Sequence, residues 1–350
     1  MSAEHFWGKR SRRIASIIGA VSAGGALLCW IFAPQAAAPA SRFAIFACLQ
    51  PAIGSLILAL IFRITGGQWG ESLRPYFGAA IRLLPWIWPL AIPFVLIQAA
   101  HPTGAAAAVS GPATVAALLV RAVFYEAIFI GAGAIALGRA PRSWAGPGLL
   151  ALVFSLHVLA ADWFFTLEPG WYSSGFPLAW MSLQAASGLS WAIAAAIASG
   201  LDPAANGEAG RPVGLDWGNL LLTTVILSTY LLFMEFLIIW SGNLPREITW
   251  YLRRSTGGWR ALISALALFH LAVPFAALLS RRVKQDRRAL GRLAFVVGVV
   301  EVLWNAWFVL PAFGDRGAML GLACVCTLAA GSAFFVIGYF AGLEPRPSSV

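Results

Sequence analysis

Long apolar runs, almost free of charged residues, alternate with short polar segments along this chain. Because a backbone in lipid must satisfy its own hydrogen bonds, and because the runs lack the two-residue alternation of barrel strands, the pattern predicts membrane-spanning helices. At about 20 residues each, most runs can cross a hydrocarbon core ~30 Å thick. We expect about ten spans, at residues 14–33, 43–62, 85–100, 113–137, 146–166, 174–199, 217–240, 261–280, 293–311 and 318–341.

The predicted fold class is therefore an all-α integral membrane protein with its helices in bundles. We expect one polytopic membrane domain at residues 14–341, with a short N-terminal segment at 1–13 and a C-terminal tail at 342–350. The first apolar run follows basic residues and precedes small ones, as in a secretory signal. It is longer than a typical signal core, so we expect it to remain as a span.

Composition and charge agree with this class. Hydrophobic residues form 60% of the chain and charged residues only 11%, with a net charge of +10. The basic residues concentrate in alternate polar segments, most densely at Arg281–Arg292. The positive-inside rule then predicts that both termini lie in the cytoplasm. The positive charge is explained by this bias, so the expected partner is the lipid bilayer and no nucleic acid is needed.

Two segments depart from simple spans. The run at 85–100 is short and carries prolines at four-residue spacing, which predicts a kinked helix. The stretch Trp69–Leu84 places Trp69, Leu73, Tyr76, Phe77, Ala80 and Leu84 on one helical face and Arg74 and Arg82 elsewhere. That pattern predicts an amphipathic helix in the cytoplasmic interface.

Two polar segments are distinctive. One is Asp162-Trp163-Phe164-Phe165-Thr166-Leu167-Glu168-Pro169-Gly170-Trp171-Tyr172-Ser173-Ser174, and the other runs from Phe236 through Asn243-Leu244-Pro245-Arg246-Glu247 to Gly257-Gly258-Trp259. Together they resemble the F subunit of bacterial alternative complex III, a quinol:cytochrome c oxidoreductase, within the NrfD-like or PsrC-like membrane proteins. The resemblance covers residues 43 to 311. In the family pattern Asp–Pro–His stands where this chain has Glu168-Pro169-Gly170.

The resemblance implies a subunit of a respiratory or photosynthetic electron-transport complex in the bacterial inner (cytoplasmic) membrane, without a tightly bound redox cofactor of its own. Haem c and iron–sulfur clusters would belong to partner subunits on the outer face. The implied partners are a second NrfD-like subunit, an iron–sulfur subunit, c-type haem subunits and a terminal oxidase. For this chain the resemblance implies either quinone or quinol binding, or a proton path.

Ionisable residues inside predicted spans carry the chemical evidence. Each such group costs about 2.5–3.5 kcal/mol on insertion scales, so several of them require partners or a polar cavity. Hydroxyls, amides and carboxylates on neighbouring helices are what a proton path needs. Thr224 and Ser228 share a helix face with one of the candidates, Glu235. The proton-path candidates are Arg121, Tyr125, Glu126, His157, Asp162, Glu235, His270, Glu301 and Asn305.

Structural roles compete with this interpretation. Arg121 could neutralise Glu126 or a carboxylate of another span, and Asp162 could cap a helix at the outer boundary. His157 and His270 could be satisfied core histidines. Glu235 and Glu301 lie deep in apolar runs without a partner nearby in sequence, so a role in proton movement is as plausible for them as a structural one.

Other function classes have weaker support in the sequence. A b-type cytochrome needs paired axial histidines, and only His157 and His270 are available. A ten-span secondary transporter is the alternative, with broken-helix signals at Pro51, Pro89 and Pro93. The four cysteines lie in apolar runs without metal-ligand spacing, so we expect no metal site. No residue set suggests a catalytic triad, so no catalytic residue is assigned.

The segment 241–260 has more basic residues than the positive-inside rule predicts for an outer loop. Its arginines and aromatic residues are of the kinds enriched at protein interfaces, although the aromatic residues also suit a membrane-interface belt. We expect this loop to dock the peripheral redox subunits through Arg246, Trp250, Tyr251, Arg253, Arg254 and Trp259.

The charge pattern gives a testable topology. The loop Arg281–Arg292 should face the cytoplasm and the segment Gly242–Arg260 the periplasm, because their basic content and the number of spans place them on opposite sides. Reporter fusions after Lys284 and after Ser255 measure this directly. Fusions that report the same compartment would contradict the ten-span arrangement.

Overall fold

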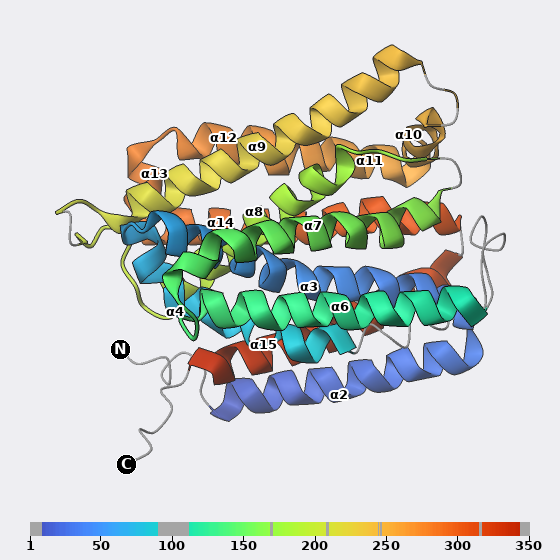
Figure 1. The fold of residues 1–350 in the computed structure, drawn as a ribbon, viewed down its shortest axis with the longest axis horizontal. Coiled ribbons are helices and arrows are strands. Elements are labelled where there is room, and N and C mark those ends of the chain that lie inside the picture. Colours follow the sequence, from blue (N-terminus) through green and yellow to red (C-terminus); the bar gives the residue numbers. More distant parts are fainter. Residues whose placement is uncertain are drawn as a thin grey trace.

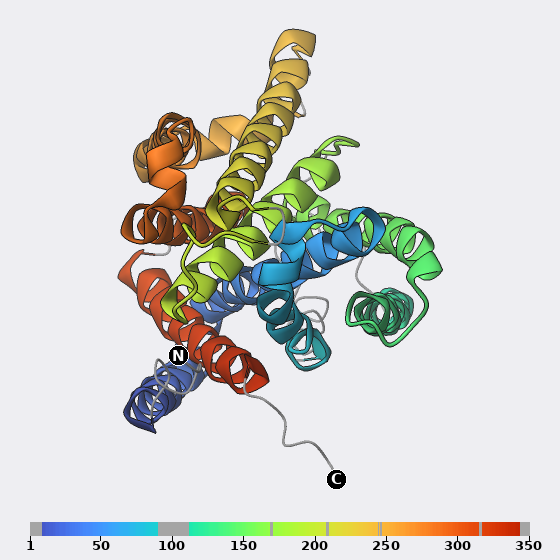
Figure 2. The ribbon, with the colours of Figure 1, turned by 90° about the vertical axis from the view of Figure 1, so that its left-hand side faces the viewer.

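The computed structural model describes residues 9–89, 112–168, 171–207, 210–243, 245, 247–314 and 317–343. Within them the regular elements are all helices, apart from one isolated bridge between Asn206 and Pro212. The long helices lie side by side in one bundle (Figure 1). Viewed from one end, α9 projects at one side of this bundle and α2 at the other (Figure 2).

The helices follow one another along the chain with short connections. They are α2 (Lys9–Phe32), α3 (Pro34–Thr65), α4 (Gln68–Ile81), α6 (Pro112–Ala136), α7 (Ala145–Phe164), α8 (Phe176–Ala198), α9 (Val213–Gly242), α10 (Ile248–Arg254), α11 (Gly257–Leu266), the π-helical turn η4 (Ala267–Ala272), α12 (Val273–Leu278), α13 (Arg281–Gln285), α14 (Arg287–Val309) and α15 (Gly317–Leu343). Short 3₁₀ turns at Arg142–Trp144, Phe165–Leu167 and Leu310–Phe313 complete the elements.

Nine helices of the described chain are long and apolar enough to cross a membrane. Each coincides with a span expected from the sequence, so the all-α, multi-pass membrane class is confirmed at this level. The remaining expected span, 85–100, lies mostly outside the described residues. The total number of crossings and their orientation stay predictions.

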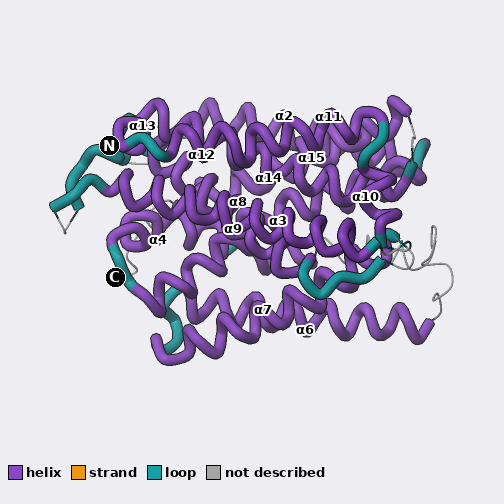
Figure 3. Tube along the Cα trace, turned by 90° about the horizontal axis from the view of Figure 1, so that it is seen from above, coloured by secondary structure: helices purple, strands orange, loops and turns teal. Residues whose placement is uncertain are grey.

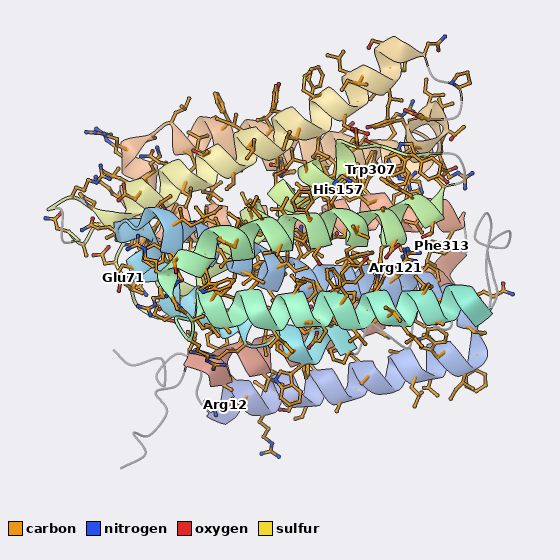
Figure 4. All side chains as sticks on the ribbon, in the orientation of Figure 1. Arg12, Glu71, Arg121, His157, Trp307 and Phe313 are labelled. Atoms are coloured by element: carbon orange, nitrogen blue, oxygen red, sulfur yellow. The ribbon has the colours of Figure 1, made fainter. Side chains whose placement is uncertain are left out.

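The two ends of the bundle differ in what they carry. Helix α2 begins, α4 lies and α15 ends at one end, which we call the inner end, while α10 lies at the opposite, outer end (Figure 1). Figure 4 shows Arg12 and Glu71 toward the inner end and Trp307 and Phe313 toward the outer one.

Helices α3, α8 and α14 form the centre of the bundle. Most of α3 is buried, whereas α2, α9 and α15 expose much of their apolar surface, as helices facing lipid do. Seen from above, α3 and α8 lie in the middle, with α6 and α7 along one side (Figure 3). The amphipathic helix predicted over Trp69–Leu84 is confirmed as α4. Its Leu73, Tyr76 and Phe77 are buried, whereas Arg74 and Arg82 are exposed.

Helices α3 and α8 approach closely because glycines face each other where they cross. A Cβ added to Gly54 would collide with the backbone of Gln184, and one added to Gly188 would collide with the backbone of Gly54 and Ser55. Small residues at such crossings let helix backbones meet and gain van der Waals contact. This crossing holds together the centre of the bundle.

We therefore expect Gly188→Ala to destabilise the protein by separating α3 from α8. Overpacking of this kind costs about 1–3 kcal/mol. The readout is the midpoint of thermal unfolding and the yield of detergent-purified protein.

Gly131→Ala is the matched control, because Gly131 also lies inside a long apolar helix but a Cβ there meets nothing within 4 Å. Alanine favours helix over glycine, so the control should be neutral or slightly stabilising. Equal behaviour of the two variants would show that the α3–α8 contact does not limit stability.

Candidate functional site

A cavity of about 370 Å³ lies toward the outer end, which we call the outer cavity. Its walls come from the start of α8, from α9, α10, α11 and η4, and from α14. The volume falls in the range usual for small-molecule sites. Most of the lining is aromatic or aliphatic: Phe176, Leu232, Phe233, Phe236, Ile263, Leu266, Leu271, Trp304, Trp307 and Phe308.

Glu235 of α9 supplies a carboxylate to this apolar cavity. Its side chain is 7% exposed, and its Oε1 atom has no hydrogen-bond partner within the described residues. Ser173, just before α8, interacts with the same carboxyl group. An unpartnered carboxylate oxygen in apolar surroundings is costly unless a ligand or water hydrogen-bonds it. Glu235 is therefore a candidate proton acceptor for a bound hydroxyl.

His270 lies on the π-helical turn η4 and also lines the cavity. Its Nδ1 atom is 3.1 Å from Glu301 Oε1 of α14, and its Nε2 atom is 2.9 Å from Ser228 Oγ of α9. His270 and Glu301 are almost completely buried. A carboxylate and an imidazole in contact can hold and pass on a proton, so this pair is a second candidate proton acceptor beside the cavity.

Polar side chains continue from this pair in two directions. On α14, the Asn305 side-chain amide donates to Gln50 Oε1 of α3 at 2.7 Å. On α9, the buried Thr224 lies one turn before Ser228. Nearer the inner end, Lys284 Nζ donates to Asn219 Oδ1 at 2.6 Å. Burial lowers the pKa of Lys284, and the nearby Arg281 lowers it further.

The helix α10 covers the outer side of the cavity and is fixed there by Arg254. This guanidinium is fully buried and donates to the carbonyl oxygens of Trp250, Trp307 and Phe308, at 2.9, 3.2 and 2.8 Å. It lies 3.2 Å from the centre of the Trp250 ring and 3.8 Å from Glu168 Oε2. Burial lowers the pKa of Arg254 to about 9, and the Glu168 carboxylate opposes that shift, so the side chain stays charged at neutral pH.

The two distinctive sequence segments meet at this point. Glu168 Oε1 also contacts Arg253 Nη2 at 3.1 Å, and the Trp171 ring stacks on the Trp250 ring at 3.9 Å. Glu168 and Trp171 come from the first segment, and the residues of α10 come from the second. Their contacts hold α10 against the outer cavity. We call Glu168, Trp171, Trp250, Arg253 and Arg254 the outer cluster.

The outer cluster corrects part of the docking prediction. Trp250 and Arg254 are buried within the chain, so their side chains are not available to a partner surface. The Arg253 side chain is 48% exposed, and Tyr251 and Trp259 are partly exposed. Burial raises the pKa of the Tyr251 hydroxyl, and Glu235 adds to that shift. Arg246 lies outside the described residues.

The candidates of α6 and α7 form a separate group. Arg121 Nη1 contacts Asp162 Oδ1 at 2.9 Å, and the Tyr125 hydroxyl donates to Asp162 Oδ2 at 2.6 Å. Arg121 is thus paired with a carboxylate of another span, and Glu126 does not provide that partner. Among the described residues, neither α6 nor α7 contributes a side chain to the lining of the outer cavity. These contacts join α6 to α7.

The two histidines differ in their surroundings. His157 is exposed on α7, so it is not a core histidine (Figure 4). His270 is buried, and both its ring nitrogens contact side chains of other helices. The pair therefore does not offer the two free, facing nitrogens that axial ligation of one haem requires.

Sequence reasoning missed Glu168, Ser173 and Gln50. Glu168 follows the fifth predicted span in a polar segment, and an acid between apolar residues and a tryptophan-containing turn is the signal that could have identified it. Ser173 and Gln50 carry no signal in the sequence, because only the folded bundle brings them to Glu235 and Asn305.

Comparison with known proteins adds no name to this site. No protein-family model matches the chain, and no curated protein matches it.

The outer cluster predicts a large effect of Glu168→Gln on stability. The substitution leaves Arg254 buried without its carboxylate, and breaking a buried ion pair typically costs about 3–5 kcal/mol. We expect a clear fall in the midpoint of thermal unfolding of the purified protein.

Arg253→Gln is the control for this experiment, because it removes the half-exposed partner of the same carboxylate. Exposed ion pairs contribute about 0–1 kcal/mol, so this variant should unfold near the wild-type temperature. If Glu168→Gln is equally harmless, Arg254 is held by its carbonyl acceptors and the ring of Trp250 alone.

Proposed function

We propose that this chain is a membrane subunit of a quinol-oxidising electron-transport complex and that a quinol binds in its outer cavity. The observation that carries the proposal is the unpartnered Glu235 oxygen on an apolar, aromatic-lined cavity that also holds the His270–Glu301 pair. The resemblance of the two distinctive segments to the alternative complex III subunit supports the same assignment.

A quinol fits the chemistry of this cavity. Its ring is flat and apolar and can pack against Phe176, Trp304 and Phe308 in the lining. Its two hydroxyl groups are hydrogen-bond donors, and carboxylates and imidazoles are suitable acceptors. Exposed apolar side chains on α9, such as Phe233, suit entry of a lipid-soluble molecule from the bilayer.

Oxidation of a quinol to a quinone releases two protons and two electrons. In this proposal one proton passes to Glu235 and the other to the His270–Glu301 pair, which serve as general bases. The electrons pass to an iron–sulfur cluster or haem c in a partner subunit. These partners would bind at the outer end, where the cavity and the exposed part of Arg253 lie.

The polar rows beyond the cavity support a role in proton movement. Asn305 and Gln50 extend the His270–Glu301 pair toward α3, and Ser228 and Thr224 extend it along α9. Side chains of this kind can relay protons when water bridges them. The bacterial inner membrane is the expected location of such a complex.

Replacement of Glu235 or Glu301 by Gln tests the proposal. Each change keeps the side-chain size but removes a proton acceptor, so quinol-dependent electron transfer by the purified complex should fall about 10²-fold. The measurement is reduction of the electron acceptor after addition of quinol, with haem c in the redox spectrum as the marker of an assembled complex.

Glu126→Gln is the matched control, because Glu126 is also a carboxylate within a span but does not line the cavity. It should retain full turnover. Wild-type turnover in both cavity variants would reject quinol oxidation at this cavity. Absence of haem c from the wild-type preparation would reject membership of the complex.

A further inference from the structure

A second cavity, of about 450 Å³, lies at the inner end between the segment after α4, the last turns of α6 and the last turns of α15. We call it the inner cavity. Its lining shares no residue with that of the outer cavity. The function proposed for the outer cavity therefore does not account for the inner cavity.

The walls of the inner cavity are apolar, and two of its lining residues are exposed. Ile130, Gly133 and Ala134 of α6 form one wall, and Gly338 and Ala341 of α15 form another. Ile130 and Trp86, which also line it, are 51% and 68% exposed. Exposed apolar side chains at the cavity suit contact with lipid.

Two guanidinium groups lie at the same cavity. Arg82 and Arg139 are both lining residues, and Arg82 Nη1 also donates to the carbonyl oxygen of Gly342 at 3.0 Å. Exposed tryptophan and arginine are the residues that anchor helices at a membrane–water interface. The cavity thus has an apolar body and a cationic rim.

More positive charge surrounds this rim. A Cβ added to Gly138, next to Arg139, would lie 3.2 Å from Arg63 Nη1 and 3.6 Å from Arg74 Nη2. Glu71 contacts one of these arginines, Arg74, at 3.9 Å. Four guanidinium groups thus gather at or beside this rim, which favours the binding of an anion there.

The cavity has room for part of a lipid chain. Its lining on α6 extends from Phe129 to Ala134, and the lining residues Leu137 and Arg139 follow the end of that helix at Ala136. An acyl chain could therefore lie along the α6 wall while its headgroup reaches Arg139 at the rim.

We propose that the inner cavity binds an anionic phospholipid of the inner leaflet. Its phosphate lies at Arg82 and Arg139, since guanidinium groups recognise phosphate oxygens through paired hydrogen bonds. Its acyl chain lies against Ile130, Gly133 and Gly338. Basic pockets between helices at the cytoplasmic side are suited to such headgroups. The bound lipid joins α15 to α4 and α6.

The experiment compares lipids on the purified full chain. The protein in mild detergent is offered equal amounts of phosphatidylglycerol and phosphatidylcholine with identical chains, and retained lipid is measured by native mass spectrometry. We expect preferential retention of phosphatidylglycerol by the wild type. Arg82→Gln with Arg139→Gln should reduce that preference about tenfold.

Two further variants separate charge from shape. Arg281→Gln with Arg282→Gln removes two exposed arginines of α13, outside the cavity, and should leave the preference unchanged. Ala341→Phe keeps every arginine but fills the cavity, and should release the lipid. Thermal unfolding in lipid-free detergent, near the wild-type value for each variant, shows that the fold is intact.

Several results would overturn the proposal. Equal retention of both lipids by the wild type would show that the rim does not select anions. An equal loss in the α13 variant would show that net charge alone attracts the lipid. Full competition by inorganic phosphate, or unchanged retention in Ala341→Phe, would show an anion site without an acyl-chain site.

Discussion

The need to pair buried charges inside an apolar bundle determines much of this structure. A charged group among apolar helices costs several kcal/mol unless another group compensates it. The compensating contacts join helices that are far apart or separated by a turn in the chain. They are Arg121 with Asp162, Glu168 with Arg254, His270 with Glu301, and Lys284 with Asn219. Apolar packing alone allows helices to slide or rotate, and these contacts select one arrangement.

The outer cavity is a consequence of this pairing. Arg254 is bound to carbonyl oxygens of α14 and to Glu168, so α10 stays over the gap between α9 and α14. Apolar side chains would otherwise close such a gap, since protein interiors pack densely. Glu235 lies on this cavity, and one of its oxygens has no hydrogen-bond partner among the described residues. A carboxylate oxygen that combines these two properties is placed to bind a ligand.

The sequence predicted the parts of this structure that depend on local pattern. Hydropathy predicted about ten spans, nine of which coincide with long apolar helices of the described chain, and helical periodicity predicted the buried face of α4. Pairing between helices could not be predicted in the same way. Arg121 and Glu126 are five residues apart and so point about 140° away from each other on a helix, which favours Asp162 as partner. That argument excludes one partner, but only the packing of α6 on α7 supplies the other.

Packing also explains why neighbouring or similar residues differ in burial. Arg253 and Arg254 are adjacent, yet a rotation of about 100° per residue leaves the first half-exposed and buries the second. His157 and His270 both lie in apolar runs, but only His270 faces the interior. Its π-helical turn precedes Pro274, which has no N–H to bond the carbonyl of His270. The proline was visible in the sequence, whereas its effect on His270 required the structure.

The two cavities offer different hydrogen-bonding groups to a ligand. At the outer cavity the donors of Arg254 already have carbonyl acceptors, whereas one oxygen of Glu235 has no donor within the described residues. The indole N–H groups of Trp304 and Trp307, two other lining residues, have no acceptor there. At the inner cavity the charged lining consists of the guanidinium groups of Arg82 and Arg139. A hydroxyl group can donate to a carboxylate and accept from an indole N–H, whereas guanidinium donors select phosphates. The two proposed ligands, a quinol and an anionic phospholipid, therefore match different cavities and would not compete.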